Sequence, residues 1–162
     1  MWLCIKSNIL ILRMVTYLMS KLMAKNWQCP KCKREFAKKN QMHSCVVFPV
    51  QEHFIGKTEI ARPLYNELLK KIRKEIGPIK IESLPCCIHL VSHYTFMCVY
   101  ALKDRIRIHF AHDKKITSKR IDKAAQLPGS KYMSSLDIYS KKEINKELIT
   151  WLKDSYNIPG RK

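Results

Sequence analysis

The chain has 162 residues, of which 46% are hydrophobic and 27% charged, a balance that allows a packed core and excludes a chain disordered throughout. Its length suits one ordinary domain with a small appendage. The 31 Lys and Arg residues against 13 Asp and Glu give a formal net charge of +18, which favours an anionic partner such as nucleic acid through long-range attraction. The alternative is a lysine-rich surface that only keeps the protein in solution.

Seven cysteines are present, and no secretory signal with a small-residue cleavage site is visible. A disulfide framework in an exported chain normally uses an even number of cysteines. We therefore expect a reducing, cytoplasmic compartment in which the thiols are available to a metal.

Residues 1–24 are predicted to be an extension. They are apolar, but Lys6, Arg13 and Lys21 interrupt every apolar run, so the uncharged runs are shorter than the roughly 20 residues of a spanning helix. The charges also fall on several faces of a helix, which argues against an amphipathic anchor. We expect no membrane role, and an extension that is disordered or loosely packed, or that results from a start assigned upstream of Met23.

Residues 25–47 predict a small zinc finger. In the pair Cys29-x-x-Cys32 the two intervening residues allow a tight turn, which Pro30 helps to fix, so both thiolates can reach one Zn²⁺ ion. Phe36 is expected to supply the small apolar core that such a finger needs. A basic segment this short has too little apolar content to fold without a metal.

His43 and Cys45 are predicted to complete the four tetrahedral ligands. Residues two apart on a helix do not face the same way, so we expect a helix that ends near His43, with Cys45 reaching back from extended chain. His53 is the reserve ligand. The alternatives are unliganded buried cysteines or a redox Cys-x-x-Cys pair, and the βαβ pattern that accompanies a redox pair is absent.

An α+β domain is predicted over residues 58–158. A helix is expected with Pro63 in its first turn and Gly77 at its end, because apolar residues follow the helical spacing between them. Strands are expected in four runs that are rich in β-branched, aromatic or alternating residues, namely IKIES, CCIHLV, YTFMCVYAL and RIRIHF. In the last run one face is apolar and the other polar; the apolar residues are Ile106, Ile108 and Phe110, and the polar ones are Arg105, Arg107 and His109.

The remaining elements follow the basic stretch HDKKITSKRIDK and a turn at Pro128-Gly129. The run SLDIY predicts a strand, and Ser140 with Glu143 predicts a capping box at the start of the final helix. This order of elements predicts an α+β fold, with one mainly antiparallel sheet and helices packed on one face in two layers.

The other cysteines and histidines are interpreted as ordinary residues of the fold. Three cysteines lie in the apolar strand runs, where packing explains them; they are Cys86, Cys87 and Cys98. The histidines near them lack a clear set of four partners, so a second metal site is not favoured; these are His89, His93, His109 and His112.

An enzyme is the less favoured interpretation, and no catalytic residue is predicted. The four glycines build no phosphate-binding loop, and no serine has a nucleophile-elbow context. Asp113 and Lys115 form an Asp-x-Lys pattern of the nuclease kind, with Asp104 as the second carboxylate. The strand between the two aspartates separates them by up to roughly 30 Å, because each residue adds about 3.3 Å, and carboxylates that far apart cannot share a metal.

Nucleic-acid binding is the favoured function, because basic residues cluster in the finger, on one strand and in the loop after it. Contacts to phosphates give affinity without sequence choice, and Tyr132 or His112 is available to stack on a base. The candidate binding residues are Lys33, Arg34, Lys38, Lys39, Arg105, Arg107, Lys114, Lys115, Lys119 and Arg120. A protein–protein adaptor and a nuclease-like enzyme are the alternatives, and the pattern does not choose between DNA, RNA and protein as the partner or predict an oligomeric state.

Four short motifs carry a resemblance to a known family. They are the Cys-Pro-x-Cys that begins at Cys29, NQMHSC, HFIGK and KELITWLKDSY. Over about residues 25–158 the chain resembles the uncharacterised, mostly bacterial family catalogued as domain of unknown function 5655. The resemblance implies a Cys-x-x-Cys…His-x-Cys zinc finger ahead of a small α+β domain, with Cys29, Cys32, His43 and Cys45 as ligands, and it implies no activity. A more distant resemblance to small α+β proteins grouped with iron chaperones would require carboxylate ligands, whereas the first predicted helix is basic.

Overall fold

The computed structural model of the protein describes residues 27–36, 39–41, 43, 45–46, 48–127 and 131–158. The predicted extension, residues 1–24, lies outside the described residues. Contacts between residues divide the chain into two compact units, residues 1–45 and 46–162, and each unit is described by itself. A search of the described residues for a membrane-spanning helix finds none.

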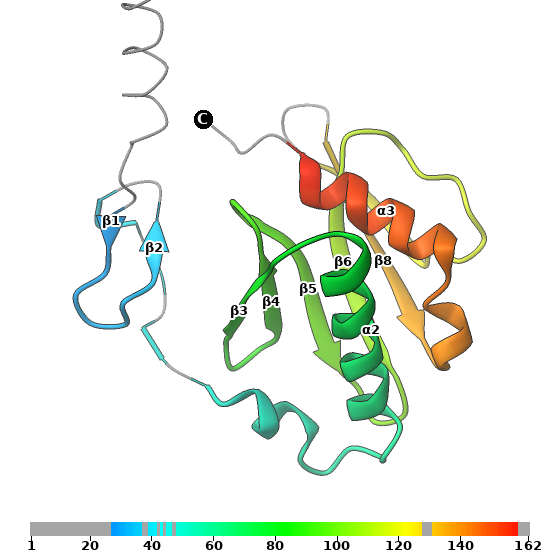
Figure 1. The fold of residues 1–162 in the computed structure, drawn as a ribbon, viewed down its shortest axis with the longest axis horizontal. Helices are drawn as coiled ribbons and strands as arrows, with labels where there is room; N and C mark the ends of the chain where they lie inside the picture. Colours follow the sequence, from blue (N-terminus) through cyan, green and yellow to red (C-terminus); the bar gives the residue numbers. More distant parts are fainter. Residues whose placement is uncertain are drawn as a thin grey trace, which may run out of the picture. The chain divides into compact units, whose positions relative to one another are not determined.

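A two-stranded hairpin is the regular structure described in the first unit. Strand β1 (Trp27–Gln28) pairs antiparallel with β2 (Glu35–Phe36), so that Trp27 lies opposite Phe36 (Figure 1). The hairpin brings the residues of the Cys-x-x-Cys turn to one end of the two strands.

The second unit is built on a six-stranded antiparallel sheet with the strand order β3-β4-β5-β6-β8-β7. Sequential strands are neighbours except at β7, which lies at the edge beyond β8. The strands are β3 (Lys80–Ser83), β4 (Ile88–Val91), β5 (Thr95–Ala101), β6 (Ile106–His112), β7 (Lys123–Leu127) and β8 (Lys131–Ile138).

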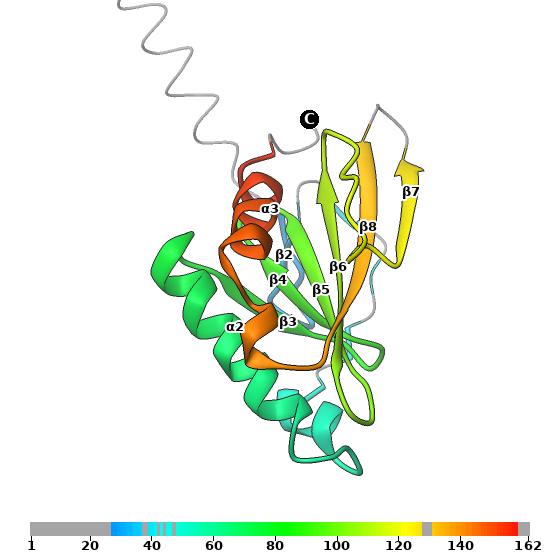
Figure 2. The same ribbon diagram turned by 90° about the vertical axis from the view of Figure 1, so that its right-hand side faces the viewer.

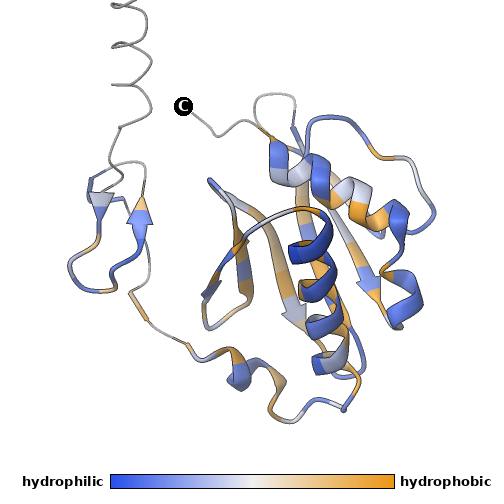
Figure 3. Ribbon diagram, viewed as in Figure 1, coloured by the Kyte–Doolittle hydropathy of each residue, from blue (hydrophilic) through white to orange (hydrophobic). Residues whose placement is uncertain are grey.

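Two α-helices, α2 (Ala61–Glu75) and α3 (Lys146–Asn157), pack on one face of this sheet (Figure 2). Short 3₁₀ turns, η1 (Val50–Phe54) and η2 (Lys141–Glu143), precede them. Figure 3 shows hydrophilic residues on the side of α2 turned away from the sheet. The predicted two-layer α+β fold is therefore confirmed.

The core lies between the sheet and its two helices, and strand β6 shows why. Ile106, Ile108 and Phe110 are fully buried among the core residues, whereas Arg107 and His109 between them are partly exposed. Residues alternate between the two faces of a strand, so the predicted apolar and polar faces of this run are confirmed.

Helix α2 ends where it was expected to end. Gly77 has a φ of +155°, a value that favours glycine because a Cβ atom is strained there. A Cβ atom at this position would also lie 3.1 Å from the hydroxyl of Tyr156. The chain can therefore leave α2 sharply and pass toward β3.

Strand β7 was not predicted; its residues run from the end of the basic stretch, at Lys123, to just before the predicted turn at Pro128-Gly129. Its sequence, KAAQL, is exposed over its first four residues and has no apolar alternation that would indicate a strand. Its pairing with β8, from Lys123 opposite Ser135 to Leu127 opposite Lys131, is a tertiary contact. β8 itself starts at Lys131, earlier than the predicted run.

The start of the last helix also differs from the prediction. Ser140 Oγ does bond to Glu143 at 2.8 Å, but the pair encloses the 3₁₀ turn η2. Helix α3 begins after Asn145, whose Oδ1 accepts a hydrogen bond of 3.1 Å from the backbone N–H of Leu148. Asn145 therefore provides the N-cap of α3.

Candidate metal centre

The turn between β1 and β2 positions Cys29 and Cys32. The backbone N–H of Lys33 donates to the Cys29 carbonyl at 2.9 Å, and the N–H of Cys29 donates to the Arg34 carbonyl at 2.9 Å. Lys33 has a φ of +59°, a left-handed conformation that closes the turn. These bonds hold both cysteine side chains on the same side of the hairpin end.

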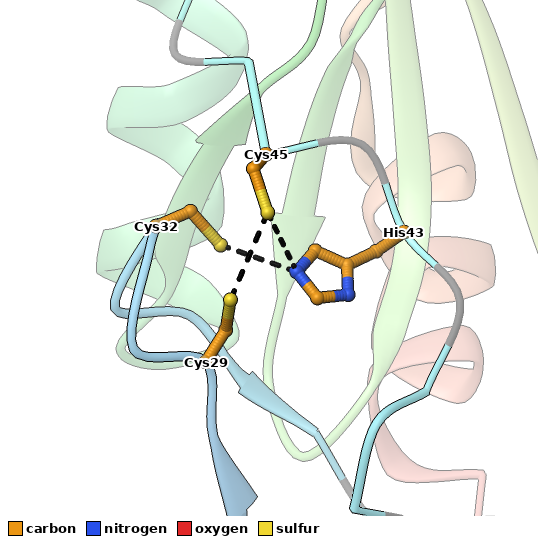
Figure 4. A group of neighbouring side chains, drawn as sticks. All are labelled: Cys29, Cys32, His43 and Cys45. Atoms are coloured by element: carbon orange, nitrogen blue, oxygen red, sulfur yellow. Dashed lines mark hydrogen bonds between the residues drawn. The ribbon is translucent and has the colours of Figure 1, made fainter.

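Cys29, Cys32, His43 and Cys45 point toward one another (Figure 4), and their ligand atoms all lie within 4.8 Å of one another. Cys29 Sγ is 3.7 Å from Cys45 Sγ, and His43 Nε2 is 3.4 Å from Cys32 Sγ and 3.2 Å from Cys45 Sγ. In a tetrahedral zinc site with bonds of about 2.3 Å to sulfur and about 2.0 Å to nitrogen, neighbouring sulfurs lie about 3.8 Å apart and sulfur and nitrogen about 3.6 Å apart. The cluster thus has the size and donor set of a four-ligand metal site.

The orientation of His43 is held by its other ring nitrogen and by aromatic neighbours. Nδ1 lies 2.6 Å from the Gln41 carbonyl, which leaves Nε2 facing the sulfurs, as is usual for a metal-binding histidine. The rings of Phe36 and Trp27 lie 4.1 and 6.0 Å from the imidazole. Phe36 therefore forms part of the small apolar core expected of it, and Trp27 is a second member that the sequence analysis missed.

The pKa values of the four side chains are shifted in different directions. Hydrogen bonding to the backbone of Cys32 lowers the pKa of Cys29. Burial acts to raise the pKa of Cys32, but hydrogen bonds from Arg34 and its other neighbours bring that pKa down to about 6. Burial raises the pKa of Cys45 to about 11, and a backbone hydrogen bond raises the pKa of His43. A metal binds the deprotonated groups, so its binding would release protons.

Two expectations about the finger are corrected. No helix is present among the described residues between β2 and Cys45, yet His43 and Cys45 face one point (Figure 4). The reserve ligand, His53, is not in the cluster. It is buried in the second unit, where Nε2 lies 3.0 Å from Ser83 Oγ and the ring packs edge-on to Phe48.

The candidate phosphate-binding residues of the finger lie around the hairpin. Lys33 and Lys39 are exposed. Arg34 is partly buried, with its guanidinium 5.7 Å from the centre of the Phe36 ring. Lys38 lies outside the described residues.

Arg105 and Arg107, two further candidates, are both paired with Asp137 on the neighbouring strand β8. Arg107 donates to both oxygens of Asp137, at 2.6 and 2.8 Å, and Arg105 Nε donates to Oδ2 at 2.8 Å. Arg105 also pairs with Asp104 at 2.7 Å. Much of the charge of these two arginines is thus compensated within the sheet.

Asp137→Asn should destabilise the second unit at neutral pH, by on the order of 1 kcal/mol after allowance for screening at this partly exposed pair. Hydrogen bonds from Arg107, and also from Arg105, hold the pKa of Asp137 below its usual range. The stabilisation is therefore present above about pH 4 and is lost as the pH falls through the lowered folded-state pKa. Urea denaturation at about pH 7 and about pH 2 checks this, with the exposed Asp154→Asn as the control. If Asp137→Asn lowers the free energy of unfolding by the same amount at both pH values, the expectation is wrong.

Arg120 also acts within the fold. It donates to Asn145 Oδ1 at 3.1 Å, to Glu147 at 2.9 Å and to the Glu143 carbonyl at 2.6 Å, and its guanidinium lies 5.8 Å from the centre of the Trp151 ring. It ties the loop before β7 to the start of α3. By contrast, Lys114, Lys115 and Lys119 of the same loop are exposed and join no ion pair with other described residues.

His112 is not available to stack on a base, because it is only 3% exposed. Its Nε2 lies 2.7 Å from Ser134 Oγ, its Nδ1 bonds to the Lys114 carbonyl, and its ring stacks on Tyr132 at 5.7 Å. It lines a cavity of about 280 Å³ with residues that include Asp113, Lys114 and Asp154. Both ring nitrogens are occupied, so the geometry shows no free general base here.

The two aspartates of the nuclease-like alternative lie beyond opposite ends of β6. Asp104 precedes the strand and Asp113 follows it, which agrees with the separation expected from the sequence. Asp104 bonds to Arg105, whereas Asp113 lines the cavity beside His112.

A second cluster of metal-ligating side chains, which was not predicted, lies at the sheet. The ligand atoms of Cys87, His89 and Cys98 lie within 4.8 Å of one another. Cys86 is exposed, so its interpretation as a core residue was wrong, whereas Cys98 is half-buried. The alternation of Cys87 with His89 along the chain was the available signal.

Comparisons with known proteins find one matching family. Residues 50–159 match the model of the family described as Domain of unknown function (DUF5655). No curated protein and no solved structure matches the chain. The matched range contains η1, both described α-helices and the whole six-stranded sheet, and the Cys29–Cys45 cluster lies ahead of it. Because the match covers more than half of the sequence, the chain belongs to the DUF5655 family.

Proposed function

We propose that this chain is a zinc-finger binding protein that contacts nucleic acid through phosphate-binding lysines, in a reducing cytoplasmic compartment. The finger, residues 25–47, and the α+β domain, residues 58–158, would act as two modules of one binding protein. Zn²⁺ suits the finger because three cysteine sulfurs and one histidine nitrogen in a small tetrahedral cluster are the donors of structural zinc sites. In this role the metal holds the hairpin, and no reaction is assigned to it.

The proposal is supported by positive charge that is not paired with carboxylates and that gathers in two segments. Segment 114–123 holds five basic residues and Asp122 as its one acidic residue, and Lys114, Lys115 and Lys119 extend from it without ion-pair partners among the described residues. Lys33 and Lys39 are likewise exposed in the finger. Lysines that are free of carboxylates can neutralise phosphates and release counterions, whereas the paired Arg105 and Arg107 are less suited to this.

Fluorescence anisotropy with labelled single- and double-stranded DNA and RNA tests the proposal between about 50 and 300 mM salt. Binding should weaken steeply as salt increases, with a logarithmic slope of about −0.7 to −0.9 for each phosphate contact. Lys114→Glu combined with Lys115→Glu should weaken binding to all sequences alike and reduce the slope, because phosphate contacts carry no sequence information.

The matched control is Lys141→Glu with Lys142→Glu, which removes two exposed lysines of η2. This double variant changes the net charge by the same amount as Lys114→Glu with Lys115→Glu, but it should weaken nucleic-acid binding less. Equal weakening by both double variants would show that only the total charge matters. If no nucleic acid binds more tightly than about 100 μM at the lowest salt, a range typical of weak non-specific binding, the proposal fails in favour of a protein-binding adaptor.

A further inference from the structure

A row of polar side chains crosses the face of the six-stranded sheet that lies opposite the described helices α2 and α3 (Figure 2). Strand pairing places Glu82 opposite His89, His89 opposite Cys98, Cys98 opposite His109, and His109 opposite Ser135. Directly paired residues project to the same face, with Cβ atoms about 4.5–5.5 Å apart. The helices α2 and α3 cover the opposite face (Figure 2). The row therefore runs across the open face from β3 to β8.

Cys87, which directly precedes β4, joins His89 and Cys98 of this row, so that two sulfurs and one imidazole come together. The ligand atoms of Cys87, His89 and Cys98 lie within 4.8 Å of one another. Cys87 is 2% exposed, whereas His89 and Cys98 are half-buried at the surface. The cluster is therefore accessible from solvent on one side and enclosed on the other.

The backbone holds these three residues in place without help from a ligand. Leu84 and Cys87 exchange two backbone hydrogen bonds, of 3.0 and 3.2 Å, which fix the turn that leads into β4. The pairing of His89 with Cys98 belongs to the ladder between β4 and β5. Because strands and core already order the ligands, binding an ion here costs little conformational entropy.

Neighbouring side chains can support the three ligands. Tyr100 lies two residues after Cys98 on β5, so its side chain projects to the same face of the sheet. Glu82 is the register partner of His89 on β3, the kind of carboxylate that often orients a metal-binding imidazole. The ring of His109 lies 4.8 Å from that of Tyr100.

We propose that Cys87, His89 and Cys98 form a second metal site, which binds a thiophilic divalent ion such as Zn²⁺. Sulfur and imidazole donors select such ions over Mg²⁺ and Ca²⁺, which prefer oxygen. Three protein ligands leave the fourth tetrahedral position open, as in zinc sites that bind water or an external ligand. The finger, by contrast, supplies all four ligands. The second site lies wholly within the α+β unit and does not depend on nucleic-acid binding.

Titration of the metal-free full-length chain with Co²⁺ tests the proposal, because cobalt bound by thiolates gives sulfur-to-metal charge-transfer absorption. The wild type should bind two equivalents with this absorption. Cys29→Ser with Cys32→Ser, which removes two finger ligands, should retain the one equivalent in the sheet. Cys98→Ser should retain only the equivalent in the finger.

Two further variants keep the test decisive. His89→Asn removes the imidazole at a half-buried position and should also lose the sheet equivalent, so the result does not depend on the folding of Cys98→Ser alone. Cys86→Ser removes the exposed cysteine whose sulfur lies 3.3 Å from that of Cys87, and it should retain both equivalents. The proposal is overturned if Cys29→Ser with Cys32→Ser binds no cobalt with this absorption, or if a folded Cys98→Ser or His89→Asn variant binds as many equivalents as the wild type. If Cys86→Ser loses the cobalt bound at the sheet site, Cys86 is a fourth ligand and the fourth coordination position is not open.

Discussion

Replacing Cys29 with serine should reduce the zinc content of the purified protein by one equivalent per chain. Cys29 is 4% exposed and its sulfur lies 3.7 Å from that of Cys45, so a serine there removes a thiolate from the centre of the cluster. The hairpin has a very small apolar core, and metal binding provides folding free energy in segments of this kind. Elemental analysis after gel filtration measures the loss.

The same variant should unfold the finger and leave the α+β unit folded. Backbone resonances of residues 27–36 should lose their dispersion, while those of β6 and α3 should keep theirs, because the second unit has its own core. Chelation of the wild type should give the same spectrum. The matched control is Cys86→Ser, an exposed cysteine outside the finger, which should retain the finger metal. A folded finger in metal-free Cys29→Ser would contradict the structural role proposed for the ion.

Phe110→Ala should destabilise the α+β unit by about 3–5 kcal/mol, the usual cost of removing a buried phenylalanine ring. Phe110 is fully buried on β6. Its ring lies nearly parallel to that of Trp151 on α3, with centroids 6.4 Å apart. The substitution leaves a cavity between the sheet and the helix, and its cost is a large part of the 5–15 kcal/mol that typically stabilises a domain.

Urea denaturation followed by far-ultraviolet circular dichroism measures this effect. Ile55→Ala is the control, because Ile55 is 68% exposed and a surface substitution usually changes stability by less than about 0.5 kcal/mol. The finger should keep its metal in Phe110→Ala at low urea. A cost near that of the control would mean that Phe110 is not part of the packed interface with α3.

Two arginines, one just before β6 and one on it, show that composition alone does not establish a function. Arg105 and Arg107 were predicted from their strand face to contact phosphate, but strand pairing places Arg107 opposite Asp137, and the carboxylate occupies both guanidinium groups. Asp137 lies 30 residues beyond Arg107, so no local pattern links the two. The proposed phosphate contacts are therefore assigned to the exposed lysines of the loop after β6, which join no ion pair with other described residues.

Much of this protein is determined by local sequence patterns. The alternation from Ile106 to Phe110 specifies a half-buried strand because side-chain direction repeats every two residues. The spacing of Cys29 and Cys32 specifies a tight turn in the finger, and Gly77 specifies the end of a helix. Each feature depends on neighbours within a few positions, so the α+β class, the antiparallel sheet and the four residues of the finger cluster could be predicted.

Only the tertiary structure decided the features that depend on distant partners. Strand β7 exists because it pairs with β8, since KAAQL has no strand pattern of its own. His53 packs in the α+β unit through Ser83, 30 residues away, which removes it from the finger. Cys98 joins Cys87 and His89 because β4 and β5 are in that register, and a shift of one residue would send its side chain to the opposite face. Register is set by the whole sheet and its core, which is why the cluster on the open face became visible only in three dimensions.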